Sequence, residues 1–404
     1  MTEVLVFVLA GGQGERLSPL TRDRAKPAVP FAGEYRIIDF TLSNCINSGL
    51  RHVFLLTQYK SYALEKHVRL AWDVYSAELG EFISLLPPQQ RMTNDWYLGT
   101  ADAVYQNIYS IRETSPEYVL VLSGDHIYRL DYRRMLRFHR RSRADATIGL
   151  YQVPLSRAHR FGVMQVDADD RVVGFQEKPR RPKPCPASPG MAMVSMGVYL
   201  FTTRALVAAL MVDAENRHST RDFGRDIIPA MVKGYRVSGF PFCGDGRAGE
   251  AYWRDVGTID DYYQANMDLV AKAPAFNLYD RRWPIRTKVR PDPPAKTVHA
   301  SFEDGRVGLA IESLLSGGAV VSGGRVERSI LGPRVRVNSY AQVQDSILFS
   351  DVEVGRNAQV RRAIIDKRVR VPAWCRIGHD PEEDRRRFHV TESGIAVLGK
   401  GTVL

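Results

Sequence analysis

The chain has few cysteines and no long apolar run. Its 404 residues include only four scattered cysteines, Cys45, Cys185, Cys243 and Cys375, with neither a CxxC pair nor a zinc spacing. This usage predicts reduced thiols in a cytoplasmic protein. No apolar run approaches the ~20 residues that a membrane span needs, so a membrane partner is not expected. The first residues lack a basic region, and their apolar run fits a buried strand better than a signal peptide.

Two common nucleotide-binding patterns are also missing from the glycine-rich segment at residues 9–30. A Walker A loop needs a Lys-Ser/Thr pair after its glycines, and none follows here. The dinucleotide fingerprint needs a third glycine at the position where Leu17 stands. The segment therefore predicts neither a P-loop ATPase nor an NAD enzyme.

What this segment does contain is typical of a phosphate-binding loop. A run of apolar residues, Val4 to Leu9, is followed by Gly11, Gly12 and Gly14 and then by Arg16, Arg24 and Lys26. Glycine lets backbone N–H groups approach a ligand closely, and successive N–H groups form a concave anion site. A tight turn with surface charges is the alternative. The coincidence of glycines, cations and prolines favours polyphosphate binding.

The net charge of +11, from 56 basic and 45 acidic residues, indicates anionic partners. The basic residues alternate with acidic ones and form no long tract. The phosphate loop already gives this charge a use, and no nucleic-acid recognition motif is present. Small anionic molecules are therefore the expected partners, and nucleic acid is not.

The order of apolar patterns along the first two thirds of the chain predicts an α/β fold. Strands are expected at residues 53–56, 118–122 and 146–153, and helices at 36–49, 62–72, 100–112 and 132–143. Residues 85–97, polar and proline-bearing, are expected to form a loop. Such an order implies right-handed βαβ units around a mostly parallel sheet, whose ligands lie beyond the carboxyl ends of the strands.

Several polar side chains are candidates for chemistry at that edge. Asp125 follows a buried strand, and with Asp255 it is our candidate pair for Mg2+; a helix N-cap and an ion pair with Arg254 are the respective alternatives. Lys178, held before Pro179, is suited to a substrate phosphate or to a solvated turn. Tyr97, Ser195 and Tyr199 are candidate hydroxyl partners for a sugar. His126 and His139 are interpreted as structural or exposed.

The last third of the chain contains an internal repeat. Val326, Val343 and Val360 are 17 residues apart, as are Ile330, Ile347 and Ile364, and a third column runs through Val320, Val337, Val354 and Val371. Three short strands per 17-residue coil predict a triangular parallel β-helix, with a β-sandwich as the alternative. The proline-rich stretch before it predicts a linker. We therefore expect a catalytic domain at 1–273, a linker at 274–298 and a β-helix at 299–404.

Several long motifs then resemble one family. LAGGxGxRLxPLTxxRAKPAVP, SGDHIY, FxEKP, SMGVY and YWRDVGT are similar to the sugar-1-phosphate nucleotidyltransferases. RIIDFTLSNCINSG, LLPPQQRM, WYLGTADAVYQN and NLYDRRWPIRT extend the resemblance nearly end to end and bring it closest to the bacterial ADP-glucose pyrophosphorylases. The resemblance implies a left-handed β-helix, a homotetramer, and synthesis of ADP-glucose and pyrophosphate from ATP and glucose 1-phosphate for glycogen formation.

The resemblance also implies a role for each matching residue. Catalytic roles fall to Arg16, Lys26, Asp125 and Asp255, the two aspartates as Mg2+ ligands. The nucleotide-binding set is Gly11, Gly12, Gly14, Arg16, Lys26, Gln89 and Gln90, with Arg91 beside it. The glucose 1-phosphate set is Tyr97, Gly162, Glu177, Lys178, Ser195, Tyr199, Asp222 and Trp253.

Regulation is where the sequence departs from part of the family. Members activated by fructose 1,6-bisphosphate tend to carry a lysine where Asp23 stands. We therefore expect an anionic metabolite to bind between the domains through Arg24, Arg36 and a tail arginine such as Arg386, with fructose 1,6-bisphosphate a weak activator. A related enzyme using UTP, dTTP or GTP, and a non-catalytic regulatory subunit, remain as alternatives.

Overall fold

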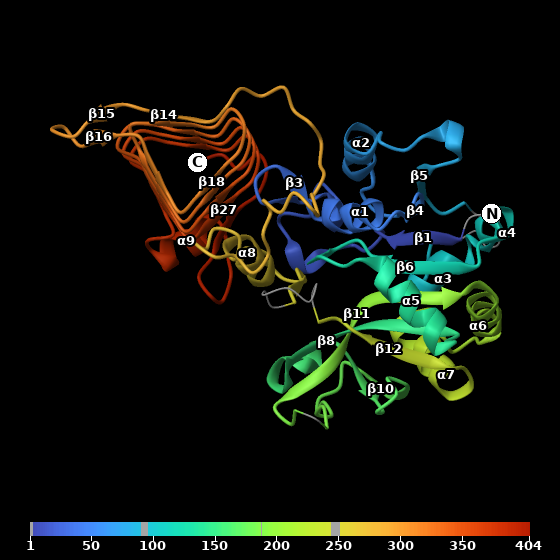
Figure 1. Ribbon diagram of the computed structural model, residues 1–404. Helices are drawn as coiled ribbons and strands as arrows, with labels where there is room; N and C mark the ends of the chain where they lie inside the picture. Colours follow the sequence, from blue (N-terminus) through green and yellow to red (C-terminus); the bar gives the residue numbers. More distant parts are fainter. Residues whose placement is uncertain (1–2, 90–95, 187, 244–250) are drawn as a thin grey trace.

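The computed structural model describes residues 3–89, 96–186, 188–243 and 251–404. Figure 1 shows a twisted sheet flanked by helices and, beside it, a stack of triangular coils that forms the C-terminal part. The α/β fold with a following β-helix is therefore confirmed. Among the described residues, no helix is long and apolar enough to cross a membrane.

A nine-stranded sheet forms the core of the N-terminal part. Its main path runs β10-β9-β11-β6-β1-β4-β5, and β8 pairs with β11 and β12. The strands are β1 (Val4–Leu9), β4 (His52–Leu56), β5 (Phe82–Leu86), β6 (Tyr118–Ser123), β8 (Ala146–Pro154), β9 (Gly162–Val166), β10 (Val172–Glu177), β11 (Met191–Thr202) and β12 (Val237–Pro241). β1 is parallel to both β4 and β6. The ends of β1 and β6 therefore bring the glycine loop and Asp125 to one edge.

Helices cover both faces of this sheet because β1 is apolar on both sides. Val4, Val6 and Val8 pack into one core with α1, α2 and α5, and Leu5 and Phe7 into another with α3, α4, α6 and α7. The helices are α1 (Ile37–Asn47), α2 (Tyr62–Ala71), α3 (Thr100–Tyr105), α4 (Ile108–Thr114), α5 (Tyr132–Ser142), α6 (Thr203–Glu215), α7 (Ile228–Gly234) and α8 (Ile259–Met267). The sheet is thus the middle of three layers.

Two local expectations were wrong. The predicted helix at 100–112 is broken into α3 and α4, because the Asn107 amide bonds to the Ala103 carbonyl at 2.8 Å and to the Tyr97 hydroxyl at 3.0 Å. The predicted loop at 85–97 begins within β5, which pairs with β4 at the sheet edge. Proline and glutamine after Leu86 hid this strand because they follow it closely.

A short two-stranded ribbon stands beside the large sheet. β7 (His126–Tyr128) pairs antiparallel with β13 (Trp253–Asp255), and Asp255 lies opposite His126 in the register. The ribbon starts directly after Asp125. It therefore joins two carboxylates that are far apart in the sequence.

Three parallel sheets build the C-terminal β-helix. Their orders are β14-β19-β22-β25-β28, β17-β20-β23-β26-β29, and β18-β21-β24-β27-β31-β30. The strands are β14 (Lys296–Val298), β17 (Leu309–Ile311), β18 (Leu314–Leu315), β19 (Val320–Ser322), β20 (Arg325–Glu327), β21 (Ile330–Leu331), β22 (Arg336–Val337), β23 (Gln342–Gln344), β24 (Ile347–Leu348), β25 (Glu353–Val354), β26 (Gln359–Arg361), β27 (Ala363–Ile365), β28 (Arg370–Val371), β29 (Arg376–Ile377), β30 (His389–Val390) and β31 (Ala396–Leu398).

The register confirms the 17-residue repeat and corrects one column. Val326 pairs with Val343 and Val343 with Val360, and all three are buried. At the first coil, however, Val321 rather than Val320 pairs with Val337 and is buried. The step there is 16 residues, so alignment on 17 selected the neighbouring valine.

Two insertions interrupt the coils, and one apolar cluster joins the two parts of the chain. The hairpin β15 (Ala300–Ser301) and β16 (Arg306–Val307) leaves the first coil, and the helix α9 (Pro381–Arg387) leaves the last. Both project from the triangular stack in Figure 1. Ile347 and Ile364 of the β-helix share a core with Leu20, Phe31 and Tyr262. The β-helix therefore packs on the segment that follows the glycine loop.

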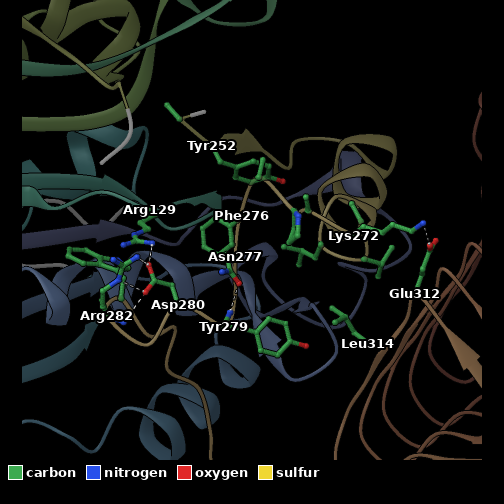
Figure 2. Close-up of a pocket in the computed structure, with 18 of the residues that line it drawn as sticks. Arg129, Tyr252, Lys272, Phe276, Asn277, Tyr279, Asp280, Arg282, Glu312 and Leu314 are labelled. Carbon is green, nitrogen blue, oxygen red and sulfur yellow. Dashed lines mark hydrogen bonds and ion pairs between the residues drawn. The ribbon is translucent and has the colours of Figure 1, made fainter. Parts of the chain in front are cut away.

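A cavity of about 960 Å³ also lies at this junction. Figure 2 shows Arg129, Asp280 and Arg282 on one side of it and the pair Lys272–Glu312 on the other. Asp280 accepts from Arg129 at 2.8 Å and from Arg282 at 2.9 Å, so charges within the chain satisfy this wall. None of the expected site residues lines this cavity.

Candidate active site

The glycine loop lines a cavity of about 790 Å³ at the carboxyl ends of β1 and β6. Gly14 has φ of 67°, which favours glycine, and a Cβ there would lie 3.1 Å from the Cβ of Lys26. The Thr21 hydroxyl donates to the Gly14 carbonyl at 2.8 Å and holds the turn. The predicted nucleotide residues Gly11, Gly12, Gly14, Arg16 and Lys26 all line this cavity.

Lys26 lies between the two candidate metal-binding carboxylates. Its Nζ is 2.6 Å from Asp125 Oδ2 and 3.6 Å from Asp255 Oδ1. Lys26 is only 7% exposed, and burial alone would lower its pKa. The two aspartates more than offset that effect and raise the pKa of Lys26 above its usual value. The amine therefore stays protonated at neutral pH.

Asp125 is held as a carboxylate by the same contacts. Burial would raise its pKa, but the charges of Lys26 and His126 and hydrogen bonds from Lys26 and Ser123 outweigh burial. The pKa of Asp125 therefore lies well below its usual range. An ionised carboxylate of this kind is available to a cation across the physiological pH range.

His126 is the member of this cluster that the sequence reading missed. Its Nε2 lies 3.5 Å from Asp125 Oδ1 and 3.7 Å from Asp255 Oδ1. These three residues offer ligand atoms that all lie within 4.8 Å of one another. Sequence spacing shows only that His126 follows Asp125. The register of the β7–β13 ribbon, which brings it to Asp255, becomes visible only in the fold.

Most of the expected sugar-phosphate residues gather around Glu177. A Cβ on Gly162 would lie 3.2 Å from the Glu177 carboxylate, and one on Gly224 would lie 3.1 Å from it and 3.2 Å from Asp222. Asp222 accepts from the Thr100 hydroxyl at 2.9 Å. Glu177 and Asp222 therefore approach each other from β10 and from the turn before α7.

The remaining sugar-side residues lie close by. Ser195 Oγ is 3.3 Å from the Tyr199 hydroxyl, whose pKa is raised to about 12, first by burial and then by Asp222 and Glu177. Lys178 Nζ lies 3.2 Å from Glu177, and its side chain is 59% exposed. The Trp253 ring packs edge-on against His126, with centroids 5.3 Å apart, so it links this group to the carboxylates.

Tyr97 and the glutamine loop differ in their surroundings from the other expected residues. The Tyr97 hydroxyl donates to the Leu86 carbonyl at 3.2 Å and accepts from Asn107, so it is turned toward the protein core. Tyr97 still lines the nucleotide cavity with other atoms. The exposed Gln89 side chain donates to the Pro87 carbonyl at 2.8 Å, and Gln90 and Arg91 lie outside the described residues.

A second, cationic cavity of about 480 Å³ lies between the catalytic part and the β-helix. Its lining includes Asp23, Arg24, Arg36, Lys367, Arg368 and Lys400. The predicted tail residue Arg386 lies on α9 and outside this lining, whereas other basic residues of the tail line the cavity. The proximity of β27 and β28, rather than the arginine run, brings tail cations here.

The charges of this cavity repel one another. Burial, with Arg24 beside it, lowers the pKa of Arg36 to about 10. Burial, with Arg36 and Arg24 nearby, lowers the pKa of Lys367 to about 6. Arg24 is buried, and its Nη1 has no hydrogen-bond partner among the described residues. An anion in this cavity would offset the repulsion and supply the missing acceptor.

Comparison with known proteins identifies the relatives of this chain. A family model described as "Nucleotidyl transferase" matches residues 5–272, and one described as "GlmU-like, C-terminal hexapeptide" matches residues 293–398. A glucose-1-phosphate adenylyltransferase of Rhodopirellula baltica is 52% identical over 100% of this chain and 91% of its own length. Proteins of that name from Koribacter versatilis (54%, covering 98% and 95%) and, as glucose-1-phosphate adenylyltransferase 2, from Vibrio cholerae (50%, covering 98% of each) are similar to it.

Proposed function

The chain belongs to the nucleotidyl transferase family and to its glucose-1-phosphate adenylyltransferases, and from this premise we propose how its residues act. The reaction joins AMP from ATP to α-D-glucose 1-phosphate and releases pyrophosphate, which makes ADP-glucose for α-glucan synthesis. The family generally uses a divalent metal. The roles below concern this chain's own residues.

The attacking group needs no general base. A sugar phosphate has a second pKa of about 6, so its oxygen is mostly dianionic at neutral pH. The obstacle is that one anion must approach another. Lys178 binds the sugar phosphate, and Glu177, Ser195 and Asp222 bind the sugar, which fixes the attacking oxygen in line with the α-phosphate.

Lys26 and Arg16 stabilise the negative charge that develops on the triphosphate. The raised pKa of Lys26 keeps its amine charged beside Asp125, and the glycine loop offers backbone N–H groups to the same phosphates. Asp125 and Asp255 hold Mg2+, since carboxylate oxygens are the ligands that this hard cation prefers. When bound, the ion supplies charge that neutralises phosphate oxygens.

The observation that carries this mechanism is Lys26 standing between two carboxylates at the edge of a glycine-lined cavity. A related enzyme that uses UTP or dTTP would share this arrangement. The test is to incubate the protein with glucose 1-phosphate, Mg2+ and each of ATP, UTP, dTTP and GTP. We expect pyrophosphate release with ATP far above the others; equal release with UTP or dTTP would overturn the preference.

We further propose that the cationic cavity binds an anionic metabolite that regulates the enzyme. Arg24 and Arg36 from the catalytic part and Lys367 from the tail form the site, and Asp23 disfavours a bisphosphate at close range. Fructose 6-phosphate or pyruvate should activate more than fructose 1,6-bisphosphate, with AMP or phosphate inhibitory. Saturation curves with each metabolite test this; strong activation by fructose 1,6-bisphosphate that survives Arg36→Ala would contradict it.

A division of labour follows from these proposals. Residues 1–273 carry catalysis, residues 274–298 connect the parts, and residues 299–404 serve assembly and regulation, in a cytoplasmic enzyme. Separate expression of 1–273 would test the division. A fragment that retains both full turnover and full activation would contradict it.

A further inference from the structure

The position of His126 is fixed by three neighbours. Across the β7–β13 ribbon it lies opposite Asp255, so the two side chains project from the same face. The Trp253 ring packs edge-on against the imidazole at an interplanar angle of 79°. On another side, a Cβ added to Gly197 would lie 3.3 Å from its Cε1. The ring is therefore closely packed and preset toward the carboxylates.

The polar contacts of His126 are all made by one ring nitrogen. Its Nε2 is near Oδ1 of Asp125 and Oδ1 of Asp255, at 3.5 and 3.7 Å. Its Nδ1 is buried and has no hydrogen-bond partner among the described residues. Lys26 is bonded to the other oxygen of Asp125, Oδ2, at 2.6 Å. One face of Asp125 is thus occupied by the amine, and the other points toward the imidazole.

Nε2 and the two Oδ1 atoms are spaced for one shared cation. Ligands at about 2.0–2.1 Å from an octahedral ion lie about 3 Å apart when they are adjacent. Separations of 3.5 and 3.7 Å exceed a good hydrogen bond and need only small movements to reach that value. The side chains are therefore better placed around a cation than bonded to one another.

We propose that His126 is a third protein ligand of the metal ion held by Asp125 and Asp255, and that its imidazole shifts this site toward Mn2+ relative to Mg2+. The proposal rests on the proposed function of the two aspartates. Imidazole binds transition metals well, whereas Mg2+ prefers oxygen. A site of two carboxylates and one imidazole therefore accepts both ions and favours Mn2+ more than two carboxylates alone would.

Mn2+ alone, bound to the full-length protein without substrates, provides the test. Pulsed electron paramagnetic resonance detects a nitrogen nucleus bonded to the ion. We expect a nitrogen coupling in the wild-type protein that changes to the 15N pattern when histidine is labelled. His126→Asn should abolish this coupling and weaken Mn2+ binding at least about tenfold, since even residues that only support a ligand commonly have effects of that size. Mg2+ affinity, measured by competition, should fall less.

The control variant is His159→Asn, because His159 is exposed and far in sequence from the cluster. It should leave both the coupling and the affinity unchanged. The labelled wild-type spectrum does not depend on whether the variant folds. Absence of nitrogen coupling in Mn2+-loaded wild type, or a coupling that persists in folded His126→Asn, would overturn the proposal, as would failure of the wild type to bind Mn2+.

Two further variants separate this proposal from the one on which it rests. Asp125→Asn and Asp255→Asn should each weaken Mn2+ binding if the carboxylates hold the ion. Loss of affinity in these variants without nitrogen coupling in the wild type would reject His126 alone. Unchanged affinity in both would reject the metal site itself.

Discussion

Arg24 and Asp366, 342 residues apart in the sequence, form a buried ion pair between the nucleotide segment and the β-helix. Arg24 Nη2 donates to both carboxylate oxygens, at 3.0 and 2.8 Å, and the two side chains are 6% and 1% exposed. Arg24 precedes Lys26 by two residues and also lines the cationic cavity. A change at the effector cavity can therefore reach the active site through one short segment.

Arg24→Ala should destabilise the protein strongly. Removing the guanidinium leaves the Asp366 carboxylate buried without its partner, which typically costs about 3–5 kcal/mol. Arg133→Ala is the matched control, because Arg133 pairs with Asp131 at the surface and such pairs contribute about 0–1 kcal/mol. Denaturant unfolding of the two variants measures the difference. Equal unfolding free energies would show that the buried pair has no special role.

Lys178→Ala should raise the KM for glucose 1-phosphate far more than the KM for ATP. The exposed amine beside Glu177 is placed to bind the sugar phosphate and not the nucleotide. Lys183→Ala, in the proline-rich loop that follows, removes the same charge from an exposed position and should leave both constants unchanged. A substrate-specific role would be refuted by equal effects of Lys178→Ala on both substrates.

Anion binding in the cationic cavity should strengthen as the pH falls. The lowered pKa of Lys367, about 6, means that its amine is mostly neutral at pH 7.5. A bound anion favours the charged form and raises this pKa, so binding takes up a proton, and affinity rises with falling pH until it levels off below about pH 6. Calorimetric titration with sulfate, which does not itself titrate here, measures the affinity and the proton uptake.

Lys367→Met provides the control for this prediction. His67 also lines the cavity and titrates in the same region, so the variant separates the two residues. The pH dependence between pH 8 and 6 should largely disappear in Lys367→Met. Sulfate affinity that is flat with pH in the wild type would contradict the role of Lys367.

Sequence patterns predicted the parts of this fold that repeat or alternate. The β-helix followed from valine and isoleucine columns because each coil places the same positions inside. Asp125 was a candidate because it follows the buried strand β6. Its partner Asp255 was selected through a motif, since 130 residues separate the two, and only the ribbon explains their proximity.

Features that depend on tertiary contacts could not be predicted. The inward turn of the Tyr97 hydroxyl is set by Asn107 and by the end of β5, neither of which shows in local propensity. Lys367 enters the cationic cavity because the β-helix packs on residues near Arg24. The arginine run at 385–387 looked more suitable by charge alone, and charge carries no information about which face a helix occupies.

The β-helices should join subunits into a homotetramer. β17, β18 and β28 end their sheets, and strand edges without a neighbour favour pairing with another chain. Light scattering at micromolar protein concentration should give about four times the chain mass of 45.5 kDa. A monomer under these conditions would count against this assembly.

The most direct test of the central claim follows the α-phosphate of ATP. Lys26 beside Asp125 and Asp255 is the geometry expected to transfer AMP to glucose 1-phosphate. With ATP labelled at the α-phosphate, the label should appear in ADP-glucose with one pyrophosphate per product, and folded Asp125→Asn should be slower by at least ~10²-fold, as loss of a charged partner in the transition state typically causes. Label appearing in ADP, or near-normal turnover in the variant, would contradict the account.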